Sequence, residues 1–159
     1  MANLICWRHA EAEVDSKTGA DIDRELTKQG RKDAVTIAKW LHQHLPANTE
    51  VLCSPARRCL ETAAALQRFN RHQKVTIAEY LSVENTVDKI AKHVLNEDSS
   101  RTILIIGHQP NLGLLIARLL KMENEACVVK KGAVWWLRQR HVDDTVQTYL
   151  FTVQHPDFV

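Results

Sequence analysis

Short apolar runs alternate with longer amphipathic segments along this chain, and that alternation restricts the possible folds more than any other feature. Residues 4–7, 51–53 and 102–106 are apolar, too short for helices, and bounded by polar or turn residues, as buried strands are. The segments between them are long enough for a helix that returns the chain across a sheet, which is the connection that parallel strands need. The sequence therefore predicts an α/β fold with a largely parallel central sheet.

Apolar residues recur at helical spacing in four of the intervening segments. Capping residues and the spacing together predict four helices: from a cap at Thr27 to about residue 45, over about 56–69, over about 87–95, and from a cap at Asn111 to about residue 120.

The remaining segments complete the expected architecture. Residues 11–25 are polar and predict a loop, whereas residues 75–78 look extended. Two stretches rich in β-branched and aromatic residues, 133–137 and 145–153, flank an Asp143-Asp144 turn and predict a hairpin. No repeat or linker interrupts the chain, so we expect residues 1–159 to form a single three-layer α/β/α domain with a C-terminal hairpin.

Charge and cysteine usage narrow the function classes. The net charge is +2, from 21 Lys and Arg against 19 Asp and Glu, which argues against a nucleic-acid or membrane-binding protein. There is no signal-peptide pattern and no run of about 18 apolar residues. The four cysteines have neither CxxC nor zinc-ligand spacing. These features favour the cytoplasm.

His42 and His44 are candidate metal ligands, because they form the only His-x-His pair in the chain. Residues two apart on a helix face different directions, so the pair does not converge on one ion. We expect no metal and no cofactor.

Chemically distinctive residues follow three of the predicted strands. Arg8 and His9 end the first, Arg58 lies shortly after the second, and His108 and Gln109 follow the third. The carboxyl ends of parallel strands meet at one edge of a sheet, so these side chains are expected to share a pocket. Arginines bind phosphate oxygens in a fixed fork, and a neutral imidazole can accept a phosphoryl group. The pattern predicts phosphoryl-transfer chemistry.

Four motifs in order resemble the histidine phosphatase superfamily, the phosphoglycerate-mutase-like proteins. They are Arg8-His9-Ala10, the Asp-x-x-Leu-Thr-x-x-Gly stretch over 23–30, the Ser-Pro-x-x-Arg-x-x-x-Thr-Ala stretch over 54–63, and Gly107-His108-Gln109-Pro110. The resemblance covers residues 4 to about 120. Ala10 stands where the family has glycine, so a positive φ at this position would strain the chain.

The short chain most resembles the SixA-type phosphohistidine phosphatases within that superfamily. The resemblance implies that His9 is the nucleophile and that Arg8, Arg58 and His108 form the phosphate pocket, with Gln109 as a further phosphate contact. The expected partner is a phosphorylated protein, such as a histidine phosphotransfer domain, or a small phosphorylated substrate. The expected product is inorganic phosphate.

Two alternatives remain open from the sequence. Larger relatives use a glutamate as general acid, and Glu79 is the nearest match, with Glu84 second. With such an acid, the chain would hydrolyse phosphomonoesters of small molecules or phosphoproteins. A non-catalytic phosphate-binding module is the alternative from another class.

Overall fold

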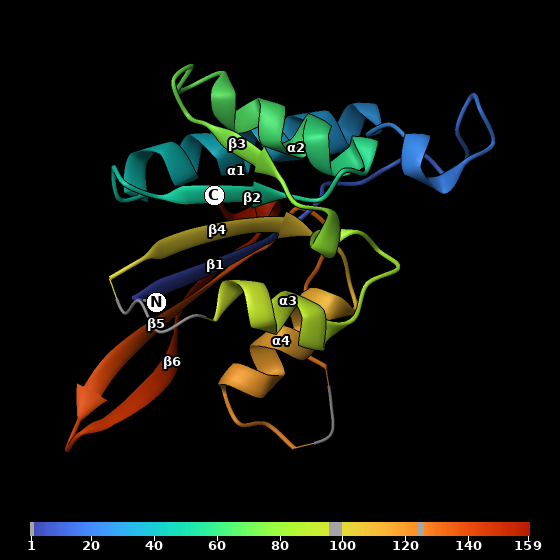
Figure 1. The fold of residues 1–159 in the computed structure, drawn as a ribbon. Helices are drawn as coiled ribbons and strands as arrows, with labels where there is room; N and C mark the ends of the chain where they lie inside the picture. The colour runs from blue at the N-terminus through green and yellow to red at the C-terminus, as the bar shows by residue number, and fades with distance from the viewer. Residues whose placement is uncertain (1, 96–99, 124–125) are drawn as a thin grey trace.

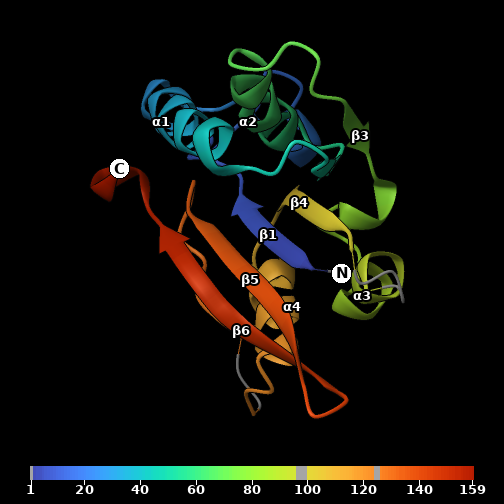
Figure 2. The ribbon, with the colours of Figure 1, turned by 90° about the vertical axis from the view of Figure 1, so that its left-hand side faces the viewer.

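The structure is a computed structural model that describes residues 2–95, 100–123 and 126–159. One six-stranded sheet runs through it in the order β3-β2-β4-β1-β5-β6, with helices on both faces (Figures 1 and 2). The strands are β1 Asn3–Arg8, β2 Glu50–Cys53, β3 Val75–Ile77, β4 Thr102–Gly107, β5 Val134–Val142 and β6 Thr145–Gln154. The α-helices are α1 Lys28–His44, α2 Arg57–Gln67, α3 Val87–Val94 and α4 Asn111–Leu119. Short 3-10 turns occur at η1 Asp21–Asp23, η2 Glu79–Leu81 and η3 Pro156–Phe158.

The sheet is parallel where helices connect its strands. β1 and β2 each pair in parallel with β4, and β2 pairs in parallel with β3. The hairpin then adds two antiparallel strands, β5 against β1 and β6 against β5. Every residue of β4 is buried, which is expected for a strand covered on both faces. The predicted α/β fold with a largely parallel sheet is confirmed.

Alternating side chains of β1 face two separate hydrophobic cores, because successive residues of a strand point to opposite faces. Ile5 and Trp7 pack with the buried faces of α1 and α2. Leu4 and Cys6 pack with those of α3 and α4. The helices thus cover both faces of the sheet, as the three-layer prediction required.

The hairpin is longer than the sequence predicted. β5 continues to Val142 and β6 begins at Thr145, with Asp143 and Asp144 both at positive φ in the turn. Aspartate tolerates this left-handed conformation better than most residues. The added residues of β5 were not predicted because residues 138–141 are polar, and residues 138–142 are half-buried or exposed, so they lack the apolar pattern of a buried strand.

The cap predictions were right for α1 and wrong for α4. The side chain of Thr27 accepts a hydrogen bond from the Gly30 amide and caps α1. α4, in contrast, is preceded by Pro110, and Asn111 is its first residue. The Asn111 side chain is buried and donates to the Asn85 carbonyl at 2.7 Å, so it ties α4 to the segment before α3 and is not available to cap a helix.

Within the described ranges, no helix is long and apolar enough to cross a membrane. The four cysteines are buried and unpaired.

Gly30 fixes the start of α1 against the segment that follows the first strand. The Thr27 amide donates to the Glu11 carbonyl at 3.0 Å, which brings the first turn of the helix directly against that peptide. A Cβ on Gly30 would overlap the Glu11 carbonyl oxygen. The glycine that ends the Leu-Thr-x-x-Gly motif is therefore required by this close approach.

Replacing Gly30 by alanine should lower the free energy of unfolding by about 1–3 kcal/mol, because backbone atoms must move apart. Urea denaturation measures the change. Gly107→Ala is the matched control: the nearest atoms to its Cβ belong to the Leu112 side chain, at 3.6 Å or more, which is an ordinary contact. Equal losses in the two variants would contradict the steric explanation.

Candidate active site

The ends of β1 and β4 bring two histidines together. β1 ends with Arg8 paired to Gly107, and the His9 amide then donates to the Gly107 carbonyl at 3.1 Å. His108 follows Gly107 directly. The rings of His9 and His108 have centroids 5.3 Å apart and are tilted by 58°. Parallel pairing thus places both rings at the carboxyl edge of the sheet.

His9 is held in one orientation by the backbone. Its Nδ1 lies 2.8 Å from the Ala10 carbonyl oxygen, which can only accept, so Nδ1 carries the proton and Nε2 keeps its lone pair. The side chain is almost fully buried, and burial is the main cause that lowers its pKa to about 3, with further lowering from His108, Arg58 and Arg8. At neutral pH the imidazole of His9 is therefore uncharged, with its lone pair on Nε2, which is the form in which a histidine acts as a nucleophile.

Ala10 fits its position without backbone strain. It is not among the described non-glycine residues at positive φ, which are Lys121, Asp143 and Asp144. Its amide donates to the Thr62 hydroxyl at 3.1 Å, and its methyl group is buried in the core beneath α1 and α2. The exchange of the family's glycine for alanine leaves a loop that holds His9 in place.

His108 is buried against residues of the third motif, 54–63. Its Nε2 lies 2.8 Å from the Ser54 hydroxyl, and its Nδ1 lies 3.4 Å from Nη2 of Arg58. Burial lowers its pKa to about 4, with Arg58 as the next cause, while the carboxylate of Asp21 opposes the change. Ser54 fixes one ring nitrogen, so the other faces the guanidinium group.

Three arginines surround these histidines. Arg58 is almost fully buried and donates from Nη1 and Nη2 to the backbone oxygen and carboxylate of Asp21, at 2.9 and 3.0 Å. Arg24 also binds the Asp21 carboxylate, at 3.2 Å, and Arg8 donates to the Val129 carbonyl at 2.9 Å. The charges of all three arginines lower the pKa of His108, so all three lie near its ring.

The Nε groups of Arg8, Arg24 and Arg58 share an unusual property. In the described part of the chain, they are the only buried side-chain nitrogen or oxygen atoms without a hydrogen-bond partner. A buried donor without a partner costs free energy, and native structures rarely leave one unexplained. Three such cations around two neutral histidines make this region suited to an anion.

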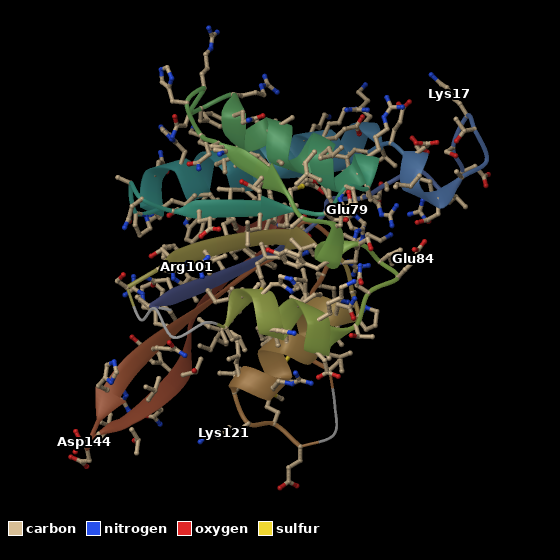
Figure 3. The ribbon with its side chains drawn as sticks, viewed as in Figure 1. Lys17, Glu79, Glu84, Arg101, Lys121 and Asp144 are labelled. Carbon is tan, nitrogen blue, oxygen red and sulfur yellow. The ribbon has the colours of Figure 1, made fainter. Side chains whose placement is uncertain are left out.

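Two predicted site residues lie outside this group. Gln109 donates from Nε2 to the Cys127 carbonyl at 2.6 Å and accepts from the Gly113 amide at 3.2 Å, so its amide braces the loop beside α4. Glu79 begins η2, after the edge strand β3, and is exposed near the carboxyl edge of the sheet (Figure 3). Within the described residues, its carboxylate has no hydrogen bond to His9, Arg8, Arg58 or His108.

Ser54, Arg24 and Asp21 also contact the site, although the sequence alone predicted no role for them. Ser54 and Arg24 stand inside recognised motifs, and their positions next to key residues were a usable signal. Asp21 lies 37 residues before Arg58 in a polar loop, and no spacing rule connects them. Arg57, the neighbour of Arg58 in the chain, is half-exposed and forms ion pairs with Glu25 and Glu61.

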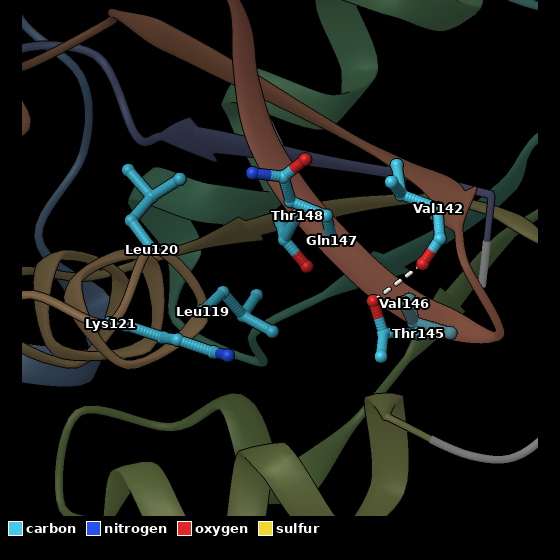
Figure 4. Close-up of a pocket in the computed structure, with 8 residues that line it drawn as sticks. All are labelled: Leu119, Leu120, Lys121, Val142, Thr145, Val146, Gln147 and Thr148. Carbon is cyan, nitrogen blue, oxygen red and sulfur yellow. Dashed lines mark hydrogen bonds between the residues drawn. The ribbon is translucent and has the colours of Figure 1, made fainter.

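A cavity of about 440 Å³ lies elsewhere, between the end of α4 and the hairpin (Figure 4). It is lined by Leu119, Leu120, Lys121 and residues on both sides of the hairpin turn. Since Asn3 of β1 pairs with Arg138, the hairpin turn lies beyond the amino end of β1, away from His9. No described residue in this lining is a histidine or an acid, so the cavity lacks the groups for phosphoryl chemistry. The described residues also contain no cluster of three or more potential metal ligands.

Comparison with known proteins identifies the family. Residues 4–82 match the family model of the histidine phosphatase superfamily, branch 1. A phosphohistidine phosphatase SixA homolog from Haemophilus influenzae is 31% identical over 77% of this chain and 79% of its own length. This chain belongs to the histidine phosphatase superfamily. It is therefore a hydrolase of the phosphatase class.

Solved structures share the whole fold. The protein histidine phosphatase SixA in complex with tungstate has a TM-score of 0.81, with 21% identity over 98% of this chain and 97% of that one. A mycobacterial glucosyl-3-phosphoglycerate phosphatase has a TM-score of 0.66, with 16% identity over 94% and 96%. The superfamily fold thus occurs in phosphatases with different substrates, and the fold alone does not select one.

Protonation of the buried histidines should make the protein sensitive to acid. An unfolded histidine takes up a proton near pH 6.5, whereas His9 and His108 do so only near pH 3 and 4 in the folded chain. The unfolded state then binds more protons, so stability falls as pH drops below about 6.5. Between pH 7 and 5, each histidine should remove about 2 kcal/mol of unfolding free energy.

Urea denaturation of wild type and His9→Asn at the two pH values measures this effect. The variant should lose about 2 kcal/mol less than wild type between pH 7 and 5, because one buried imidazole is gone. His72→Asn, at an exposed position, is the control and should keep the wild-type loss. Identical losses in His9→Asn and wild type would contradict the assignment.

Proposed function

We propose that this protein is a phosphohistidine phosphatase that works through a covalent phosphoryl intermediate on Nε2 of His9. The observation that carries the proposal is the set of partnerless Nε groups of Arg8, Arg24 and Arg58 around a neutral His9. Such a site can hold an anionic phosphoryl group against a nucleophile that needs no deprotonation.

The first step transfers the phosphoryl group from substrate to His9. The lone pair on Nε2 attacks phosphorus, and the phosphorus–nitrogen bond of the substrate breaks. Its electron pair stays on the substrate nitrogen, which leaves as a neutral imidazole when its other ring nitrogen carries a proton. The developing positive charge on His9 is stabilised by the Ala10 carbonyl, which accepts from Nδ1–H at 2.8 Å.

The second step returns His9 to its starting state. A water oxygen attacks phosphorus, the bond to Nε2 breaks, and its electron pair returns to Nε2. Inorganic phosphate carries away the oxygen and protons of the water. In this step His9 is the leaving group, and it leaves as a neutral imidazole because Nδ1 has kept its proton throughout.

His108, Arg8 and Arg58 are proposed to stabilise the charge on the transferred group. Donors already fixed in place are worth most in a buried site, since they need no reorganisation during the reaction. Ser54 fixes the ring of His108 through Nε2, and Asp21 fixes the guanidinium of Arg58.

Phosphohistidine is favoured over phosphomonoesters as the substrate class. The Haemophilus influenzae relative is named as a phosphohistidine phosphatase homolog, and SixA was solved with tungstate, a tetrahedral oxyanion like phosphate. An alkoxide leaving group would need a general acid, and the exposed Glu79 is not bonded to the pocket residues. Phosphohistidine can carry the required proton on its own ring. The partner is then a phosphorylated protein, with a histidine phosphotransfer domain as the specific expectation.

Trapping the intermediate tests the central proposal. Wild type incubated with a phosphohistidine-bearing protein and quenched in alkali should yield one acid-labile phosphoenzyme, which peptide mapping should assign to His9. His9→Ala should form none and lose turnover, because no other group replaces the nucleophile. Undiminished turnover in His9→Ala would refute the mechanism. Phosphate binding without turnover in wild type would favour a non-catalytic module.

His108→Ala should reduce kcat by about 100- to 1000-fold, because a group proposed to stabilise transition-state charge is lost. Single-turnover kinetics should show slower phosphoryl transfer to His9, while the intermediate still forms. Cys59→Ala is a nearby control, since the thiol lies 3.5 Å from the same ring and has no proposed role in the reaction. A kcat for His108→Ala within a few-fold of wild type would reject this role.

A further inference from the structure

Asp21 is the only carboxylate, among the described residues, that is bonded to the arginines of the site. It pairs with Arg58 at 3.0 Å and with Arg24 at 3.2 Å. The Arg58 side chain is 4% exposed and that of Asp21 is 55% exposed, so Asp21 covers the buried guanidinium and faces solvent. It begins η1, in the segment after β1 that lies at the carboxyl edge of the sheet (Figure 1).

A carboxylate at the entrance of an anion site is unexpected for a simple phosphate pocket. The negative charge of Asp21 repels an incoming phosphoryl group. Its backbone oxygen and its carboxylate also accept hydrogen bonds from Nη1 and Nη2 of Arg58. Its side chain is also close enough to His108 to oppose the lowering of that pKa. A carboxylate is repelled by the phosphoryl group, so the part of a substrate that it can bind is a hydrogen-bond donor on the leaving group.

The leaving group of phosphohistidine provides that part. The phosphorus–nitrogen bond breaks readily only when the distal ring nitrogen is protonated, since the ring otherwise leaves as an imidazolate anion. A carboxylate that accepts a hydrogen bond from the distal N–H favours the protonated, reactive form. Phosphomonoesters have no such N–H and gain nothing from the carboxylate.

His9 also has to leave phosphorus with a proton on its distal ring nitrogen. His9 leaves phosphorus in the second step, and its Nδ1–H is held by the Ala10 carbonyl at 2.8 Å. In an in-line transfer the substrate ring lies on the opposite side of phosphorus, toward solvent. Asp21 is an exposed acceptor bonded to Arg58, so a substrate ring that faces solvent can reach its carboxylate.

We infer that Asp21 determines specificity by accepting the distal N–H of the substrate's phosphorylated histidine. Two ion pairs position its carboxylate, which keeps the leaving imidazole protonated as its bond to phosphorus breaks. The inference rests on the proposed phosphohistidine phosphatase activity and names the residue that selects this substrate over monoesters.

The test compares two substrates in three proteins. The substrates are a peptide carrying phosphohistidine and p-nitrophenyl phosphate, whose leaving nitrophenolate needs no proton. The proteins are wild type, Asp21→Asn and Asp23→Asn. Asparagine at position 21 can still accept from Arg58, so the change removes charge and little else. Asp23 lies in the same η1 turn and accepts a hydrogen bond from Thr18, and in the described part of the chain its carboxylate forms no ion pair with the site arginines, which makes it a matched control.

Asp21→Asn should lower the ratio of kcat/KM for the phosphohistidine peptide to that for p-nitrophenyl phosphate by at least tenfold. The alkaline limb of the peptide reaction should also move about one pH unit lower, because the substrate ring loses its proton more easily. Asp23→Asn should keep the wild-type ratio and profile.

Three outcomes would overturn the inference. An unchanged ratio in Asp21→Asn would show that the carboxylate does not distinguish the leaving groups. Equal losses on both substrates would assign Asp21 a structural role in holding Arg58. Wild type that hydrolyses p-nitrophenyl phosphate but not the phosphohistidine peptide would overturn both the inference and the proposed function, whereas the first two outcomes leave the proposed function standing.

Discussion

The parallel ladder between β1 and β4 ends with Arg8 opposite Gly107, and the next hydrogen bond runs from the His9 amide to the Gly107 carbonyl. This pairing puts His9 and His108, 99 residues apart in the chain, on adjacent strand ends. β2 pairs with the other side of β4, and the Ser54 amide continues that ladder to the Ile106 carbonyl. The short loop that begins at Ser54 leads into α2, whose second residue is Arg58. Everything proposed about the chemistry depends on these adjacent parallel strands.

Burial then sets the charge state of the site. Removing His9 and His108 from water keeps both imidazoles neutral, and the neighbouring arginines reinforce this effect. Arginine stays charged even when its pKa falls on burial, as that of Arg8 does. The result is a cationic site that contains two neutral imidazole rings. Asp21 is its only ion-paired acid among the described residues, and it lies on the solvent side.

Much of this arrangement could be predicted from the sequence. Buried strands and amphipathic helices have distinct periods, so the α/β fold and the order of its elements were confirmed. Because the carboxyl ends of parallel strands meet at one edge of the sheet, the sequence also predicted that Arg8, His9, Arg58 and His108 lie together. The structure places them at that edge. The hydrogen-bond partners of amide side chains were harder to predict, because an amide can donate to or accept from many groups. Asn111 bonds to a distant loop and does not cap α4, and Gln109 braces the loop that contains Cys127.

The sequence by itself determined the family, the layered fold and the pair of residues, Arg8 and His9, that ends the first strand. These follow from local patterns, because burial periodicity and strand-end motifs are written in consecutive residues. Only the tertiary structure decided which groups hold the site residues in place. The Ser54 hydroxyl bonds to His108, the Ala10 carbonyl bonds to His9, and the Asp21 carboxylate bonds to Arg58. Two of these three contacts join residues 37 or more positions apart, and such contacts depend on how the loops pack over the sheet edge, which no local pattern specifies.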